Sequence, residues 1–108
     1  MQGSVKPIVI ANNGTASEVI DQTHETLSSI YVPTITAATI QVKGSMDGTN
    51  FKDIKDTTGA VVGLWASSTG DFICDADTIA RLVGIPFLQI VSGGAQGAAR
   101  TFLVRLVR

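Results

Sequence analysis

The sequence predicts an all-β fold, a jelly-roll-like antiparallel β-sandwich of about eight short strands with one short helix. Short apolar runs recur at intervals of roughly 8–12 residues, the spacing of strands in sandwiches and barrels. Glycine, asparagine, aspartate and serine cluster between these runs and supply turns. The run at residues 38–43 also alternates strictly, with Ile40 and Val42 on one side and polar residues on the other. That alternation is the period of a half-buried strand.

The expected strands follow one another from the first apolar run to the last. They cover residues 7–11, 17–20, 27–32, 38–43, 51–54, 60–65, 72–74, 85–91 and 101–107. The last run is apolar at both alternating sets of positions, as expected of a strand that lies centrally or is covered by a partner. Asp77 is expected to cap a short helix through residues 79–83, and Gly84 to end it.

The turns carry residues that tolerate a positive φ angle. Asn12, Asn13 and Gly14 follow the first run, and Asp47–Gly48 stands where a hairpin is expected. A longer glycine-rich loop, residues 92–97, precedes the last strand. It lacks the lysine of a phosphate-binding loop and leads into a strand instead of a helix. We interpret it as an exposed, adaptable connection.

Length and composition describe a single domain with its own core. The chain has 108 residues, enough to fold without a disulfide or a metal. We divide it into an N-terminal arm, residues 1–6, and one β-sandwich domain, residues 7–108. Charged residues make up 16% of the chain, below the usual quarter or so. A surface with so few charges suggests that neighbours cover part of it.

Charge and hydropathy argue against two classes of partner. The net charge is −1 and the 8 lysines and arginines form no run, so the basic stripe that nucleic-acid binding requires is missing. The apolar run at residues 8–11 is too short for a signal-peptide core, and no stretch is long enough to span a membrane. We therefore expect neither nucleic acid nor a membrane as a partner, and synthesis in a cytoplasm.

No set of residues predicts catalysis, a cofactor or a metal site. Asp71, Asp75 and Asp77 form an acidic cluster, but the spacing and the glutamate of a calcium loop are missing, so turn or cap roles fit better. His24 lies in a polar stretch without a nucleophile motif and is interpreted as an exposed loop residue. Cys74 lies in an apolar run and is interpreted as a small core residue.

Trp65 is the one tryptophan of the chain. Its apolar neighbours Val61, Val62 and Leu64 favour core packing. A contact with a partner, or stacking on a sugar, are the alternatives that its aromatic face allows.

Four segments of the chain form an ordered pattern. They are residues 41–51, with the spacing Ser-x-Asp-Gly-Thr-x-Phe, residues 56–59, residues 87–93 and residues 98–104. In this order they resemble a widespread group of small bacteriophage proteins that are encoded among virion structural genes. The resemblance implies a β-sandwich that decorates or cements an icosahedral head, or for some members a place in the tail. It implies no catalytic residue.

The function that follows from this resemblance is that of a capsid decoration protein of the virion. Such a protein binds the outside of the assembled head and stabilises contacts between major capsid proteins, because its site is complete only in the expanded shell. The expected partners are the major capsid protein and further copies of the chain, as a dimer or trimer, with assembly in the host bacterial cytoplasm. A tail or receptor-binding module that recognises a host glycan is the alternative. A small hydrolase that uses His24 is a third hypothesis.

Two segments are the expected contacts with the capsid or a sister subunit. The first is the N-terminal arm, which consists of Met1, Gln2, Gly3, Ser4, Val5 and Lys6. The second is the loop after residue 91, in which Gly93, Gly94, Gln96 and Gly97 are expected to become ordered on binding. An open edge strand could also pair with a strand of the capsid.

Overall fold

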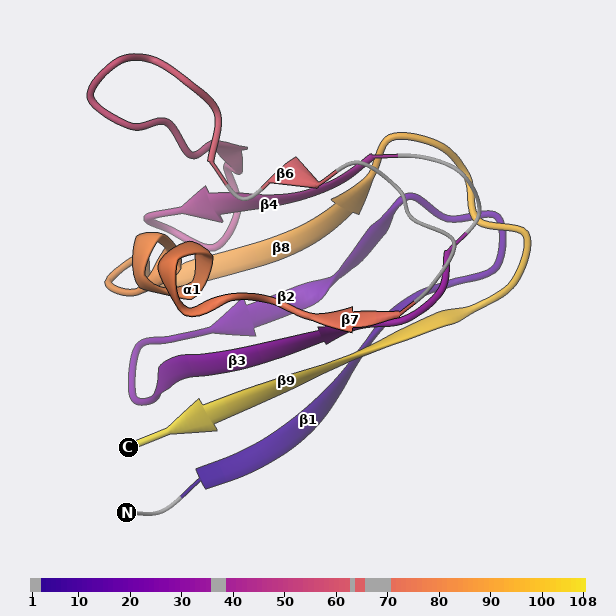
Figure 1. The fold of residues 1–108 in the computed structure, drawn as a ribbon, viewed down its shortest axis with the longest axis horizontal. Helices are drawn as coiled ribbons and strands as arrows, with labels where there is room; N and C mark the ends of the chain where they lie inside the picture. The colour runs from indigo at the N-terminus through magenta and orange to yellow at the C-terminus, as the bar shows by residue number, and fades with distance from the viewer. Residues whose placement is uncertain (1–2, 36–38, 63, 66–70) are drawn as a thin grey trace.

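The computed structural model of this chain describes residues 3–35, 39–62 and 71–108, and the backbone of residues 64–65. Within these residues it contains nine strands and one helix (Figure 1). In chain order they are β1 (Gly3–Ile10), β2 (Ala16–Asp21), β3 (Thr26–Val32), β4 (Ile40–Ser45), β5 (Lys52–Asp53), β6 (Leu64–Trp65), β7 (Phe72–Ile73), α1 (Ala76–Leu82), β8 (Phe87–Ser92) and β9 (Arg100–Val107). The strand pairs are antiparallel. The predicted antiparallel all-β class with one short helix is confirmed.

The strands join in one sheet that curls on itself. Its order is β5–β4–β8–β2–β1–β9–β3–β7, and β6 also pairs with β4. β2 pairs with β8 on one side and meets β1 on the other. It therefore joins the two walls of the fold, one formed by β5, β4 and β8 and the other by β1, β9, β3 and β7. The result is a curled half-barrel in place of the two stacked sheets predicted for a jelly-roll-like sandwich (Figure 1). The sequence predicted the strands, but the long-range pairing that joins them has no local signature.

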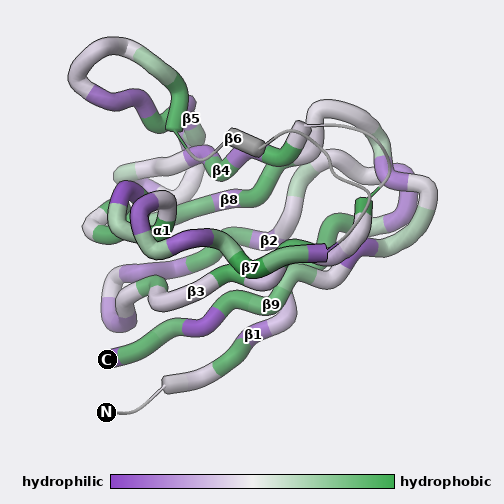
Figure 2. The backbone as a smooth tube through the Cα atoms, viewed as in Figure 1, coloured by the Kyte–Doolittle hydropathy of each residue, from purple (hydrophilic) through white to green (hydrophobic). Residues whose placement is uncertain are grey.

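The concave side of the sheet holds the hydrophobic core. In β9, Phe102, Val104 and Leu106 are buried and the residues between them are more exposed. The predicted alternation of β4 is confirmed, because Ile40 and Val42 are buried. Figure 2 shows hydrophobic stretches along the strands and hydrophilic ones in the loop that follows β5. Burying a side chain of this size contributes roughly 1.5–3 kcal/mol, so these residues hold the curled sheet together.

The helix α1 packs against β3 and closes the core with Ile79 and Leu82, which are both buried. Its N-cap is Asp75, whose carboxylate accepts a hydrogen bond from the backbone N–H of Thr78. The predicted cap, Asp77, is wrong, because that residue lies in the first turn, where its charge faces the positive end of the helix. Asp75 and Asp77 both precede the apolar run, and only the position of the first turn distinguishes them.

The end of the helix agrees with the prediction. Gly84 follows the last turn with a φ of 91°, a conformation that glycine adopts without strain. No helix among the described residues is long and apolar enough to cross a membrane.

β1 begins before the strand predicted from Pro7, so the predicted arm at residues 1–6 is wrong from Gly3 onwards. Gly3–Lys6 pair with Val104–Val107 of β9 in unbroken register. Sequence reasoning missed this half of the strand because Ser4 and Lys6, which share a side with the buried Ile8 and Ile10, are polar where apolar residues would be expected. These residues therefore belong to the sheet.

Candidate interaction surface

The first predicted contact segment lies on the margin of the sheet. All of the residues from Gly3 to Pro7 are exposed, and Val5 is 59% exposed. A strand in a sheet usually buries one of its two faces, so exposure on both faces leaves this half of β1 accessible to a partner. Met1 and Gln2, the other residues of this predicted contact, lie outside the described residues.

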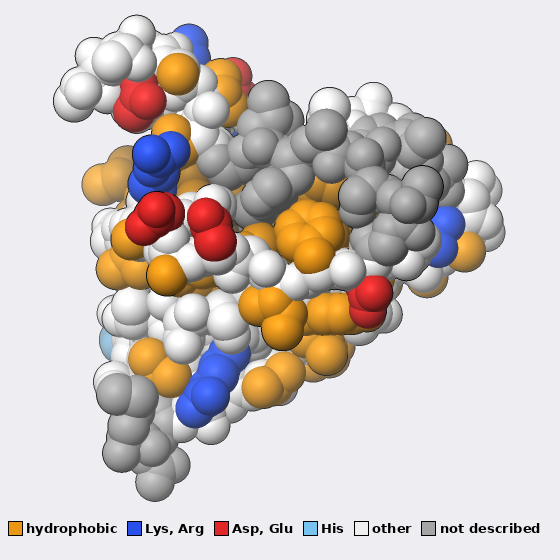
Figure 3. Space-filling model, in the orientation of Figure 1, with side chains coloured by type: hydrophobic (Ala, Val, Ile, Leu, Met, Phe, Trp, Pro, Cys, Tyr) orange, Lys and Arg blue, Asp and Glu red, His pale blue; other side chains and the backbone are white. Residues whose placement is uncertain are grey.

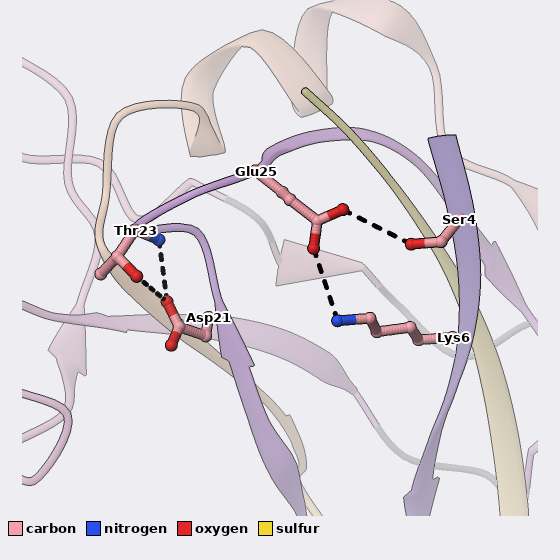
Figure 4. A network of polar contacts seen from close by, with 5 residues as sticks. All are labelled: Ser4, Lys6, Asp21, Thr23 and Glu25. Atoms are coloured by element: carbon pink, nitrogen blue, oxygen red, sulfur yellow. Dashed lines mark hydrogen bonds and ion pairs between the residues drawn. The ribbon is translucent and has the colours of Figure 1, made fainter. Parts of the chain in front are cut away.

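A polar cluster lies beside this segment, between β1 and the turn that joins β2 to β3 (Figure 4). The Glu25 carboxylate accepts a hydrogen bond from Ser4 Oγ and forms an ion pair with Lys6 Nζ, both at 3.5 Å. Asp21 accepts hydrogen bonds from the hydroxyl and the amide of Thr23, which lower the pKa of Asp21. Glu25 thus links the turn to β1, whereas Asp21 holds the turn itself.

The residues considered for catalysis or metal binding are spread over the fold. His24 is exposed on the turn between β2 and β3, as predicted. Cys74 is buried in the core, as predicted, and its burial raises the pKa of the thiol to about 11, so little thiolate forms at neutral pH. Asp71 accepts a hydrogen bond from the Tyr31 hydroxyl at 2.7 Å, and Asp75 caps α1. Among the described residues, no three metal-ligating side chains come together.

The second predicted contact, the loop after β8, is fixed to the fold through Gln96. The residue is only 1% exposed, and its Nε2 donates a hydrogen bond to Ser92 Oγ at 2.7 Å. The backbone carbonyl of Gln96 accepts a hydrogen bond from the backbone N–H of Asn13 at 2.8 Å, and the backbone N–H of Gln96 donates to the backbone carbonyl of Gly14 at 3.2 Å. The side chain of Gln96 is thus engaged within its own loop, and the turn between β1 and β2 holds its backbone. A contact of Gln96 with a partner stays a prediction.

The remaining predicted contact residues differ in exposure. Gly93 and Gly97 are exposed, whereas Gly94 is half-buried. The N–H of Gly93 donates to the carbonyl of Thr39 at 2.8 Å, so this end of the loop is also attached to the fold. A binding role for these glycines stays a prediction. The side chain of Trp65 lies outside the described part of the chain.

The turn of the Ser-x-Asp-Gly-Thr-x-Phe pattern is built around Asp47. Its carboxylate accepts hydrogen bonds from the amides of Asn50 and Thr49 and from the hydroxyl of Ser45. The two amides, first among these donors, hold the pKa of Asp47 well below its usual range. Gly48 has a φ of 81°, which confirms the predicted Asp-Gly turn.

An open cavity of about 370 Å³ lies next to this turn. Its walls include Ile54, Ile85 and Met46, the last of which is 80% exposed at the rim. Asp47 also borders it, but its carboxylate is engaged within the turn. Lys52 and Asp53 line it as well, so the cavity combines apolar walls with a charged side.

The convex side of the sheet carries an apolar row across four strands. Pro7 of β1 lies opposite Leu103 of β9, and Leu103 lies opposite Tyr31 of β3. Tyr31 in turn lies opposite Ile73 of β7. Leu103 is 40% exposed and Ile73 is 69% exposed, and Figure 3 shows hydrophobic side chains gathered over β7, β9 and β1. We call Pro7, Leu103, Tyr31 and Ile73 the outer row.

The outer row combines apolar area with a fixed geometry. β9 lies between β1 and β3 in the sheet, so pairing on both edges holds the strand that carries Leu103 in place. The hydroxyl of Tyr31 is held by Asp71, which fixes the ring as well. The sequence signal for this surface was the apolar character of both faces of the last strand, which predicted a central or covered strand. The row is suited to contact with an apolar surface of another protein.

No protein-family model, curated protein or solved structure matches this chain. What this surface can bind therefore follows from its own geometry and chemistry.

Proposed function

We propose that this chain is a structural protein of a bacteriophage particle. It binds the outside of the assembled head, stabilises contacts between major capsid proteins, and acts without catalysis. The ordered pattern at residues 41–51, 56–59, 87–93 and 98–104 supports its assignment to a virion. The observation that carries the binding role is the outer row, an exposed apolar strip on a rigid sheet.

The outer row favours contact with a protein for two energetic reasons. Burying apolar surface is favourable by about 25 cal/mol per Å². The residues of the row are already held by the sheet, so binding loses little conformational entropy. A contact that forms only on the expanded shell stabilises that state in proportion to its affinity and occupancy. Many symmetry-related copies then sum to a large effect on the head.

The test is binding of the purified chain to heads of the encoding phage that lack it, with occupancy measured by cryo-electron microscopy. Leu103→Glu places a charge in the middle of the outer row, so we expect at least a ~10-fold loss of affinity because that charge would have to be desolvated. Ile73→Glu tests the more exposed end of the row with less risk to folding. Met46→Glu is the matched control, since it adds the same charge at an exposed apolar residue outside the row.

Three outcomes decide the proposal. Loss of occupancy with both row variants, but not with Met46→Glu, supports it. Wild-type occupancy of Leu103→Glu and Ile73→Glu would remove the outer row as the contact. Density for the chain on the tail, together with glycan binding by the isolated protein, would replace the head protein by a receptor-binding module.

A further inference from the structure

β1 has one edge that no strand covers over most of its length. It pairs with β9 from Gly3 to Ile10, but it meets β2 at a single position, Ile10 opposite Ser17. From Gly3 to Val9, no strand in the described part of the chain pairs with the second edge. In Figure 1, β1 forms the lower margin of the sheet and its N-terminal end points away from β2.

The hydrogen bond of Val9 shows which backbone groups face this edge. The Val9 N–H donates to Glu18 Oε1 at 3.3 Å and so points away from β9. Along an antiparallel strand, each residue directs its N–H and its C=O to the same side, and that side alternates from one residue to the next. Gly3, Val5 and Pro7 therefore face the free edge together with Val9. Pro7 agrees with this assignment, because a proline has no N–H to give to a ladder.

The edge is protected at one end and open at the other. Glu18 occupies the N–H of Val9, and Pro7 removes a donor, two devices that limit strand pairing. Gly3 and Val5 have no such protection within the part of the chain that the structure describes, and both are exposed. The open part thus offers the N–H groups of Gly3 and Val5 and the carbonyls of both residues and of Pro7.

We propose that a second copy of this chain pairs with this edge, β1 against β1, antiparallel about a twofold axis at Val5. Each Val5 N–H then donates to the Val5 carbonyl of the other copy. Each Gly3 N–H donates to the Pro7 carbonyl of the other copy. The pairing buries the Val5 side chain, which is 59% exposed in one copy, and continues the sheet through both copies.

The strand is complementary to itself in this register. The ring of Pro7 lies opposite Gly3, which has no side chain to clash with it. On the concave side Lys6 lies opposite Ser4, whereas a register centred on Lys6 would place two ammonium groups opposite each other, which is unfavourable. A register centred on Ser4 would leave the Pro7 carbonyl without a donor among the described residues. The register centred on Val5 is therefore favoured over its neighbours.

The twofold axis of such a pair stands perpendicular to the sheet, so both outer rows lie on the same side. One dimer would then present two apolar strips to one surface, and the second contact would form at a high effective concentration. The self-pairing goes beyond the proposed function and does not depend on it, because it concerns the isolated chain.

Sedimentation equilibrium of the purified chain over a range of concentrations tests the pairing. Val5→Pro removes the central donors without touching the ladder to β9, and we expect dimer affinity to fall at least ~10-fold. Pro7→Val is the opposite change, since it adds a donor opposite the Gly3 carbonyl, and we expect affinity to rise ~10-fold. Circular dichroism and melting temperature should show that both variants keep the fold.

The register has its own test. Val5→Cys should form a disulfide-linked dimer under mild oxidation, since directly opposed residues of a hydrogen-bonded pair have Cα atoms about 5.5 Å apart. Cys74 is buried and serves as the internal control, because the unmodified chain should not cross-link. A dimer that forms without this cross-link would overturn the register centred on Val5.

Two results would overturn the pairing itself. One is a monomer at all concentrations for both the wild type and Pro7→Val. The other is a dimer whose affinity neither Val5→Pro nor Pro7→Val changes. Neither result bears on head binding, which is measured on particles.

Discussion

The turn around Asp47 and the loop around Gln96 both reverse the chain next to a buried strand, but different interactions hold them. The partners of Asp47, namely Ser45, Thr49 and Asn50, lie within three residues of it. The backbone of Gln96 binds Asn13 and Gly14, near the other end of the chain. One loop thus depends on an exposed carboxylate and local donors, the other on a buried amide and long-range contacts. The two should differ in their response to mutation and to pH.

The largest effect is expected at Gln96. Gln96→Ala removes a fully buried side chain, leaves the Ser92 hydroxyl without the donor that lies 2.7 Å away, and opens a cavity. We expect the free energy of unfolding to fall by about 2–4 kcal/mol, measured by urea denaturation. Gln41→Ala is the control, because the Gln41 side chain bonds Asp53 in an exposed position and should cost ~0.5 kcal/mol or less. Equal effects of the two changes would mean that Gln96 does not anchor the loop.

Asp47 should give a smaller effect that depends on pH. Its folded-state pKa is lowered from an ordinary value of 3.8. The charged carboxylate therefore stabilises the fold above that value, and this contribution is lost as the pH falls through the lowered pKa. Asp47→Asn should be less stable than the wild type at pH 7, but its loss of stability should be smaller than that of Gln96→Ala.

The difference between the melting temperatures of the wild type and Asp47→Asn isolates this residue. The difference should shrink as the pH falls from about 5 towards 2. Taking the difference matters because the pKa values of Asp21, Asp56 and Asp75 are also lowered, by hydrogen bonds with threonines first. A difference that stays constant with pH would show that the charge of Asp47 does not hold the turn.

The same contrast explains what the sequence could predict. The Asp47 turn could be predicted because its donors are neighbours in the chain, and β4 could be predicted because Ile40 and Val42 alternate with polar residues. The burial of Gln96 could not, since its backbone partners are near the other end of the chain. Joining the two walls through β2 depends on long-range pairing in the same way.

The candidate surface was predictable to a similar extent. The apolar character of both faces of residues 101–107 pointed to a covered strand, and β9 supplies Leu103 to the outer row. The paired state of Gly3–Lys6 was missed, because the strand ends in exposed, partly polar residues and only β9 shows that they are part of the sheet. The free edge of β1 is likewise visible only once the pairing of β1 and β2 is known to stop at Ile10.

The smallest effect is expected at Asn13, on the other side of the Gln96 anchor. Asn13 has a φ of 65°, and its backbone N–H donates to the Gln96 carbonyl. The bond needs this left-handed conformation but not the side chain. Asn13→Gly should therefore change the free energy of unfolding by about 0.5 kcal/mol or less. Asn13→Ala should cost ~1 kcal/mol, because its Cβ disfavours a positive φ.

Combining Asn13→Ala with Gln96→Ala completes the test. Both residues act on one anchor, so the cost of Asn13→Ala should shrink once the loop has been loosened by Gln96→Ala, and the two effects should not add. Urea denaturation of the four proteins of this cycle measures the coupling. Additive costs would show that the turn at Asn13 is held independently of Gln96, and the backbone bond between them would then contribute little to fixing the loop.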